Sequence, residues 1–358
     1  MRTNLVAILV AYAAADVADD HMQNASLACS AVAPFLPRSY WRGSPGRPAT
    51  PACPRLSNAT PTSSCRYLFI AGAHFSGTTA LYALLSSSRN VANLCPMQPV
   101  CEGGRMAIAK PSRDAAQTDA WAAVASKPGG RFDNILKGYR TIWDRKGRAL
   151  YMEKTPALNV VWAPFYFDFL RRLGVPASHI SFMLLTRSPC HLKGGAPPLW
   201  SPLPVWGPWV DPEVVRRYGP DATPPPDGWS WAQRNVSGEV GWRFALERIA
   251  ATLDRLNARG AHVVLVDYQA MVLDPQATSR ALSELTPCLG AIDPEAKPQP
   301  IFGRWGGGTS ARGTSLASFS RSLRNDTRDK APPAHEYAVS SELRDVLGRL
   351  GYINTNKV

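Results

Sequence analysis

One short stretch of the chain constrains its fold more than any other. Residues 67–85, "YLFIAGAHFSGTTALYALL", begin as an apolar run, pass through a turn that contains Gly72 and Gly77, and leave it as a second apolar run. The first run is typical of a strand and the second of a helix. A strand that leads through such a turn into a helix is a building unit of parallel α/β sheets.

The pattern of the remaining chain repeats this alternation. Strands are predicted at residues 66–71, 150–153, 179–186 and 262–267, and helices at 77–86, 114–126, 157–173, 240–259, 275–285 and 340–350. This order predicts an α/β fold, a P-loop-like three-layer sandwich with a central parallel sheet and helices on both faces. Residues 194–228 are rich in Pro and Trp and are expected to form an irregular insertion.

The start of the chain has the composition of a targeting segment. In residues 1–18, Arg2 precedes an apolar core of about a dozen residues, which is typical of a signal peptide or a short signal anchor. That core is shorter than the roughly 20 residues of a membrane span. We therefore expect membrane contact only through this segment. Residues 19–66 are expected to form a Pro/Ser-rich stalk or linker, followed by one folded domain at 67–358.

Glycosylation sequons support the secretory pathway, with the protein either in the Golgi lumen or secreted. The Asn-x-Ser/Thr pattern occurs at Asn24, Asn58, Asn235 and Asn325.

In the secretory pathway the seven cysteines are expected to lie in an oxidising environment, where disulfides form. Cys95 and Cys101 are close enough in the chain to pair, as are Cys53 and Cys65. Cys190 could pair with Cys288 across the fold, which would leave Cys29 unpaired; the sequence does not fix the pairing. No cysteine or histidine spacing indicates zinc, and we expect no metal.

The formal net charge of +13 points to an acidic partner, such as a nucleotide or an anionic glycan. The alternative is a general compositional bias toward Arg, because only nine of the forty basic residues are Lys. The basic residues are spread along the chain without the runs typical of nucleic-acid binding, so no nucleic-acid partner is expected.

The glycine turn has the spacing of a phosphate-binding loop. Gly72 and Gly77 are separated as in the G-x-x-x-x-G-K-[ST] motif, but Thr78 occupies the lysine position and Thr79 follows. Backbone N–H groups at such a turn, together with the helix dipole, bind phosphate oxygens. The missing lysine argues against hydrolysis of ATP or GTP, and the alternative interpretation is a plain tight turn.

Four segments in order resemble the sulfotransferases that use 3′-phosphoadenosine 5′-phosphosulfate as donor. "SGTTALYALL" is similar to their 5′-phosphosulfate loop, and "YMEKTPALN" at residues 151–159 to the Glu-Lys-Thr-Pro segment of the Golgi heparan-sulfate-type enzymes. "SFMLLTRSP" at 181–189 resembles the element that opens the 3′-phosphate site. "VLVDYQAMVLDP" at 264–275 resembles a later strand and turn, with Gln269 in place of a glutamate.

The resemblance spans about residues 67–290 and implies transfer of a sulfonate group to a hydroxyl or amine, with a carbohydrate as the expected acceptor. It implies that the donor is bound by Gly72, His74, Phe75, Ser76, Gly77, Thr78, Thr79, Arg187, Ser188 and Arg312. Lys154 is the candidate for stabilising charge on the transferring group; its alternative role is an exposed ion pair with Glu153. Glu102 and His74 are the candidate general bases.

Two departures from the family pattern bear on activity. The family has a Lys or Arg just before Ser-Gly-Thr-Thr, where this chain has Phe75 preceded by His74. A serine expected about eight residues after Arg187 is absent, since that position is Gly195, and its role passes to Ser188 or Ser201 or is lost. These departures keep open a non-catalytic binder of anionic glycans with the same fold, and, with less support, a kinase-like phosphotransferase.

Overall fold

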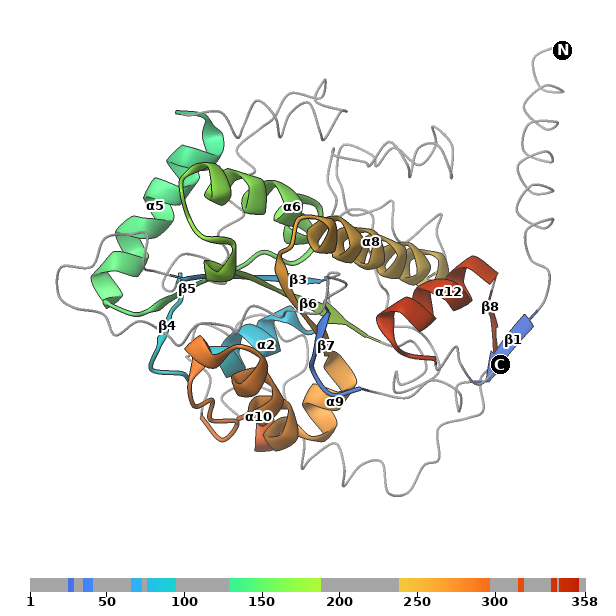
Figure 1. Cartoon of the computed structure of the whole chain (residues 1–358). Coiled ribbons are helices and arrows are strands. Elements are labelled where there is room, and N and C mark those ends of the chain that lie inside the picture. Colours follow the sequence, from blue (N-terminus) through green and yellow to red (C-terminus); the bar gives the residue numbers. More distant parts are fainter. Residues whose placement is uncertain are drawn as a thin grey trace, which may run out of the picture.

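The structure, a computed structural model, describes residues 25–28, 35–40, 66–72, 76–94, 129–187, 238–296, 315–318, 336–339 and 341–353. The helix expected at 114–126 and the insertion at 194–228 lie outside these residues, as does the 1–18 segment. The described part is an α/β structure in which helices lie on both sides of one large sheet (Figure 1).

The large sheet has six strands in the order β2-β7-β6-β3-β5-β4. The strands are β2 (Arg38–Tyr40), β3 (Arg66–Gly72), β4 (Val91–Ala92), β5 (Leu150–Lys154), β6 (Ile180–Thr186) and β7 (His262–Asp267). All neighbours are parallel except β2, which runs antiparallel to β7. The predicted parallel sheet is thus found for five strands, and the antiparallel strand β2 at its edge was not predicted. Because β2 belongs to the sheet, the sheet also begins earlier in the chain than Arg66.

A second, two-stranded sheet joins distant parts of the chain. β1 (Ala25–Ala28) pairs antiparallel with β8 (Glu336–Val339), with Ala25 opposite Val339. Neither strand was predicted, because each is short and is defined by a partner about 300 residues away.

The helices follow the strands much as predicted. They are α2 (Thr78–Leu85), α5 (Arg131–Lys146), α6 (Pro156–Arg172), α8 (Gly238–Ala258), α9 (Tyr268–Leu273), α10 (Pro275–Leu285) and α12 (Ser341–Leu350). Single turns of 3-10 helix occur at Ala177–His179 and Pro287–Leu289. The bounds of α10 coincide with the predicted ones, whereas α5 and α9 were not predicted. Among the described residues, no helix is long and apolar enough to cross a membrane.

Side chains of the central strands alternate between two apolar cores, one on each face of the sheet. In β3, Tyr67, Phe69 and Ala71 pack with α5, α6, α8 and α12, whereas Leu68 and Ile70 pack with α2, α9 and α10. Both sets are almost completely buried. Parallel strands covered on both faces need apolar side chains at every position, which explains the uninterrupted apolar runs in the sequence.

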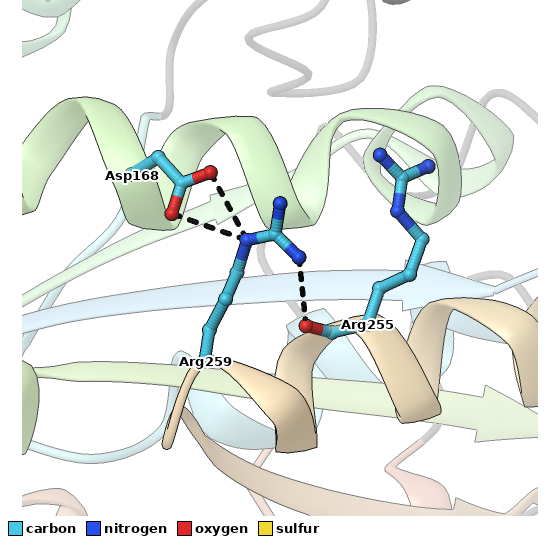
Figure 2. A network of polar contacts seen from close by, with 3 residues as sticks. All are labelled: Asp168, Arg255 and Arg259. Atoms are coloured by element: carbon cyan, nitrogen blue, oxygen red, sulfur yellow. Dashed lines mark hydrogen bonds and ion pairs between the residues drawn. The ribbon is translucent and has the colours of Figure 1, made fainter.

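An ion-pair network on the surface ties α6 to α8 (Figure 2). The Arg259 Nε donates to both oxygens of Asp168, at 3.1 and 3.0 Å, and its Nη1 donates to the carbonyl oxygen of Arg255 at 3.0 Å. The Arg255 guanidinium lies 5.0 Å from the ring centroid of Phe165. The pair is partly exposed, so it orients the two helices and contributes little stability.

The order of the strands makes the carboxyl end of β3 a topological switch point. After β3 the chain enters α2 on one face of the sheet, whereas the neighbouring strands β5 and β6 are followed by α6 and α8 on the other face (Figure 1). Open α/β sheets bind ligands at the point where the connections diverge in this way.

Candidate functional site

The described residues on either side of the turn between β3 and α2 lie very close together. A Cβ placed on Gly72 would lie 2.8 Å from the Ser76 Oγ, 2.9 Å from the Leu185 carbonyl oxygen and 2.9 Å from the Thr78 Cγ2. Real Cβ atoms do not approach other atoms so closely, so only glycine fits at position 72. The described ends of the loop thus meet above the last residues of β3 and β6.

Gly77, at the other end of the loop, is required for two reasons. Its φ of +96° is a left-handed conformation that glycine adopts without steric cost. A Cβ at this position would also lie 2.1 Å from Cδ2 of the Tyr268 ring. The aromatic ring therefore packs directly against the backbone where α2 begins.

The first turn of α2 is prepared to receive an anion. Gly77 is the N-cap residue and has no side chain to accept from the backbone N–H groups, and the first turn contains no acidic residue. Ser76 and Thr78 are buried beside the loop, and Thr79 is half-buried. Backbone donors at a helix N-terminus, two threonine hydroxyls and the positive end of the helix dipole suit a phosphate-like group.

Lys154, the last residue of β5, lies next to this turn. Its side chain is fully buried, its Nζ donates to the Thr79 Oγ1 at 3.2 Å, and it lies 5.9 Å from the ring centroid of Tyr82. Parallel pairing sets Lys154 opposite Ile70, two residues before the end of β3. A buried ammonium at the loop can neutralise charge that develops there, and it does so more strongly than in water.

The alternative role of Lys154, an exposed ion pair with Glu153, is wrong. Both residues are buried, and because successive strand residues point to opposite faces, Glu153 lies on the side of α5 and α6. There it accepts a hydrogen bond from the Thr155 hydroxyl. Burial, and after it the charge of Glu153, raises the pKa values of Tyr139 and Tyr166 well above their usual range.

Arg187 leaves the end of β6 and stacks on an aromatic ring. Its Cζ lies 4.6 Å from the ring centroid of Tyr268. Burial lowers the pKa of Arg187, while Tyr268 and Asp267 act in the opposite direction, and the group remains charged at neutral pH. Burial in turn raises the pKa of Tyr268. Cation–π stacking fixes the plane of the guanidinium, which is needed for bidentate contact with phosphate.

Tyr268 connects the parts of the site. One ring contacts Gly77 at the start of α2 and Arg187 at the end of β6. Tyr268 was not among the predicted site residues. The sequence nevertheless indicated its position, because Tyr268 directly follows the aspartate that ends an apolar strand, where α/β folds place ligand-binding groups.

The structure therefore brings together seven of the predicted site residues, from the ends of β3, β5 and β6. They are Gly72, Ser76, Gly77, Thr78, Thr79, Lys154 and Arg187. The other predicted residues lie outside the described residues: His74, Phe75, Glu102, Ser188, Arg312 and the sequons at Asn24, Asn58, Asn235 and Asn325.

Two further features concern cofactors and redox state. Within the described ranges, no group of three or more His, Cys, Asp or Glu side chains is arranged to hold a metal ion. Cys288 is buried and disulfide-bonded, and the other six cysteines lie outside the described residues.

Comparison with known proteins adds no family: no protein-family model matches the chain, and no curated protein matches it in sequence.

Proposed function

We propose that this protein is a sulfotransferase that moves a sulfonate group from 3′-phosphoadenosine 5′-phosphosulfate to a hydroxyl or amine of a carbohydrate acceptor. We further propose that its α/β fold is P-loop-like. The observation that carries the proposal is the convergence of Gly72, the start of α2, Lys154 and Arg187 at the carboxyl ends of the central strands. The four sequence segments that resemble sulfotransferases are the segments that meet there.

The residues present suit the two anionic ends of this donor. The 5′-phosphosulfate is assigned to the start of α2, with Ser76, Thr78 and Thr79 as donors beside the backbone N–H groups. The 3′-phosphate is assigned to Arg187, which is already oriented by Tyr268. The donor has no γ-phosphate, so a lysine at position 78 is not needed.

The reaction requires a balanced exchange of bonds at sulfur. The acceptor oxygen or nitrogen forms a bond to sulfur, the bond between sulfur and the 5′-phosphate oxygen breaks, and that phosphate leaves with the negative charge. Lys154 is assigned to stabilise this charge from its buried position beside Thr79. The acceptor proton passes to a general base, for which Glu102 and His74 remain the candidates.

We place this activity in the secretory pathway, in the Golgi lumen or outside the cell. The N-terminal segment, the four sequons and the disulfide at Cys288 support that assignment. An anionic glycan acceptor also suits the net charge of +13.

Calorimetry with 3′-phosphoadenosine 5′-phosphate tests the first step of the proposal. The wild-type protein should bind this nucleotide, and Arg187→Ala should weaken binding at least about 100-fold, because the bidentate contact to the 3′-phosphate is lost. Absence of binding to the wild-type protein would overturn the proposal.

Two other outcomes separate the alternatives. Donor binding without transfer of radiolabelled sulfonate to any glycan in a broad panel would favour a non-catalytic binder. The departures from the family pattern at Phe75 and Gly195 are the reason for considering this alternative. ATP that competes as well as the sulfonate donor would favour a kinase-like enzyme.

A further inference from the structure

A buried polar cluster lies beneath Arg187, on the face of the sheet opposite α2. It is built from the last residues of β6 and β7, Thr186 and Asp267, which are paired in register and fully buried. Tyr352, from the C-terminal end of the described chain, joins them. Its hydroxyl donates to the Thr186 Oγ1 at 2.7 Å, and Thr186 in turn donates to the carbonyl oxygen of Val266 at 3.4 Å.

Tyr352 is held in this cluster by contacts with the N-terminal edge of the domain. Its ring packs edge-on against Phe35, with centroids 5.1 Å apart, and the Arg38 guanidinium lies 4.5 Å from the centroid of the same Phe35 ring. Arg38 also donates to the Leu350 carbonyl oxygen at 2.5 Å. A Cβ at Gly351, whose φ is +80°, would collide with Arg38, so the chain turns into the cluster only with glycine there.

We propose that Tyr352 is a positioning residue for Arg187 and so sets how well the protein distinguishes a nucleotide that carries a 3′-phosphate from one that does not. This inference rests on the proposed function. Thr186 directly precedes Arg187, so a hydrogen bond that holds the Thr186 side chain holds the backbone from which the arginine leaves the sheet.

The arginine is thereby fixed from two sides. Tyr268 orients its guanidinium on the α2 face, while Tyr352 anchors its backbone through Thr186 on the opposite face. Neither tyrosine needs to touch the donor for this role. Pre-orientation lowers the entropy lost when a flexible side chain binds an anion, and a bidentate contact is sensitive to small displacements of its backbone.

The experiment compares two ligands, 3′-phosphoadenosine 5′-phosphate and adenosine 5′-monophosphate, by calorimetry. The ratio of their affinities reports the contribution of the 3′-phosphate. Tyr352→Phe removes only the hydroxyl and should reduce this ratio about three- to ten-fold, mainly through weaker binding of the 3′-phosphorylated ligand. Thr186→Val, which removes the acceptor at nearly constant volume, should reduce it similarly.

Two controls make the test specific. In an Arg187→Ala background, Tyr352→Phe should change the ratio no further, because the group that it positions is gone. Tyr139→Phe removes another buried tyrosine hydroxyl, one without a hydrogen-bond partner among the described residues, and should leave the ratio unchanged.

Two results would contradict the inference. An unchanged ratio in Tyr352→Phe and Thr186→Val, whether both nucleotides bind as in the wild type or both bind equally more weakly, would assign Tyr352 a purely structural role. A further reduction in the Arg187→Ala background would mean that Tyr352 acts independently of the arginine. Failure of the wild-type protein to bind either nucleotide would instead overturn the proposed function itself.

Discussion

The helices that follow β3 and β7 begin in contact with each other, since the Tyr268 ring lies against Gly77, yet their first turns differ. α9 is closed by its own side chain: the Asp267 Oδ1 accepts from the backbone N–H groups of Gln269 and Ala270 at 2.6 and 2.9 Å. α2 starts at a glycine that offers no acceptor. The capping side chain of α9 satisfies two of its orphan donors, whereas the N-cap residue of α2 offers its donors no side-chain acceptor.

This difference distinguishes a structural junction, at α9, from the proposed binding junction, at α2, within one sheet edge. An aspartate at the start of α2 would stabilise the helix but would repel an anion, whereas at α9 it stabilises the turn that carries Tyr268. The charges around the two junctions agree with this division. The buried cation Lys154 lies beside α2, and the buried anion Asp267 caps α9.

The largest effect is expected at the binding junction, from Lys154→Met. Methionine is unbranched and close to lysine in length, so it can occupy the buried site of Lys154. The rate of sulfonate transfer should nevertheless fall about 100- to 1000-fold, since a donor to developing charge is lost. The assay is transfer of radiolabelled sulfonate to an acceptor identified in the glycan panel.

The control for this prediction is Lys146→Met, a partly buried lysine on the last turn of α5 whose Nζ donates to the Asn93 side chain. It should leave the transfer rate unchanged. If Lys154→Met kept the wild-type transfer rate, Lys154 would not take part in the reaction.

The second effect is expected from Gly77→Ala, which forces a side chain between α2 and Tyr268. The left-handed backbone costs about 1–2 kcal/mol, and the collision with the ring adds a similar amount, so the free energy of unfolding should fall by about 3 kcal/mol. Denaturant unfolding measures this change.

Gly147→Ala separates the two costs, because Gly147 has a φ of +57° and a Cβ added there would meet no described atom within 4 Å. Only the backbone cost of about 1–2 kcal/mol is expected there. Equal losses of free energy of unfolding in the two variants would show that the collision with the Tyr268 ring adds nothing to the cost of Gly77→Ala.

The smallest effect is expected from removing the cap at the structural junction. Asp267→Ala should lower the free energy of unfolding by about 2 kcal/mol, because one buried and one partly buried backbone donor lose their acceptor. Asp274→Ala, at the exposed start of α10, removes one such bond and should cost about 1 kcal/mol. Thermal or denaturant unfolding of both variants decides whether burial makes the difference, and a larger loss at Asp274 would contradict it.

Much of the site could be predicted because it is encoded locally. The loop between Gly72 and Gly77, the lysine that ends β5 and the arginine that follows β6 are each recognisable within about ten residues of sequence. Their meeting at one edge follows from the general rule that parallel strands end on the same side. Tyr268 was not predicted as a site residue because its role depends on contacts with two other segments, not on its neighbours in the chain.

The elements that were missed divide into two kinds. α5 carries a clear helical pattern, with Phe132, Ile135, Tyr139 and Trp143 on its buried side, and it could have been found from the sequence. β2 and β4 are only three and two residues long, and they exist as strands because β7 and β5 supply their hydrogen-bonding partners.

The sequence by itself determined the four long strands β3, β5, β6 and β7, the helices α2, α6, α8, α10 and α12, and the position of the glycine turn, because periodicity and turn chemistry act over a few residues. Only the tertiary structure decided the strand order, the opposite faces taken by Glu153 and Lys154, and the docking of Tyr352 beneath Arg187. These depend on pairing and packing between segments up to about 300 residues apart, whose relative placement no local pattern specifies.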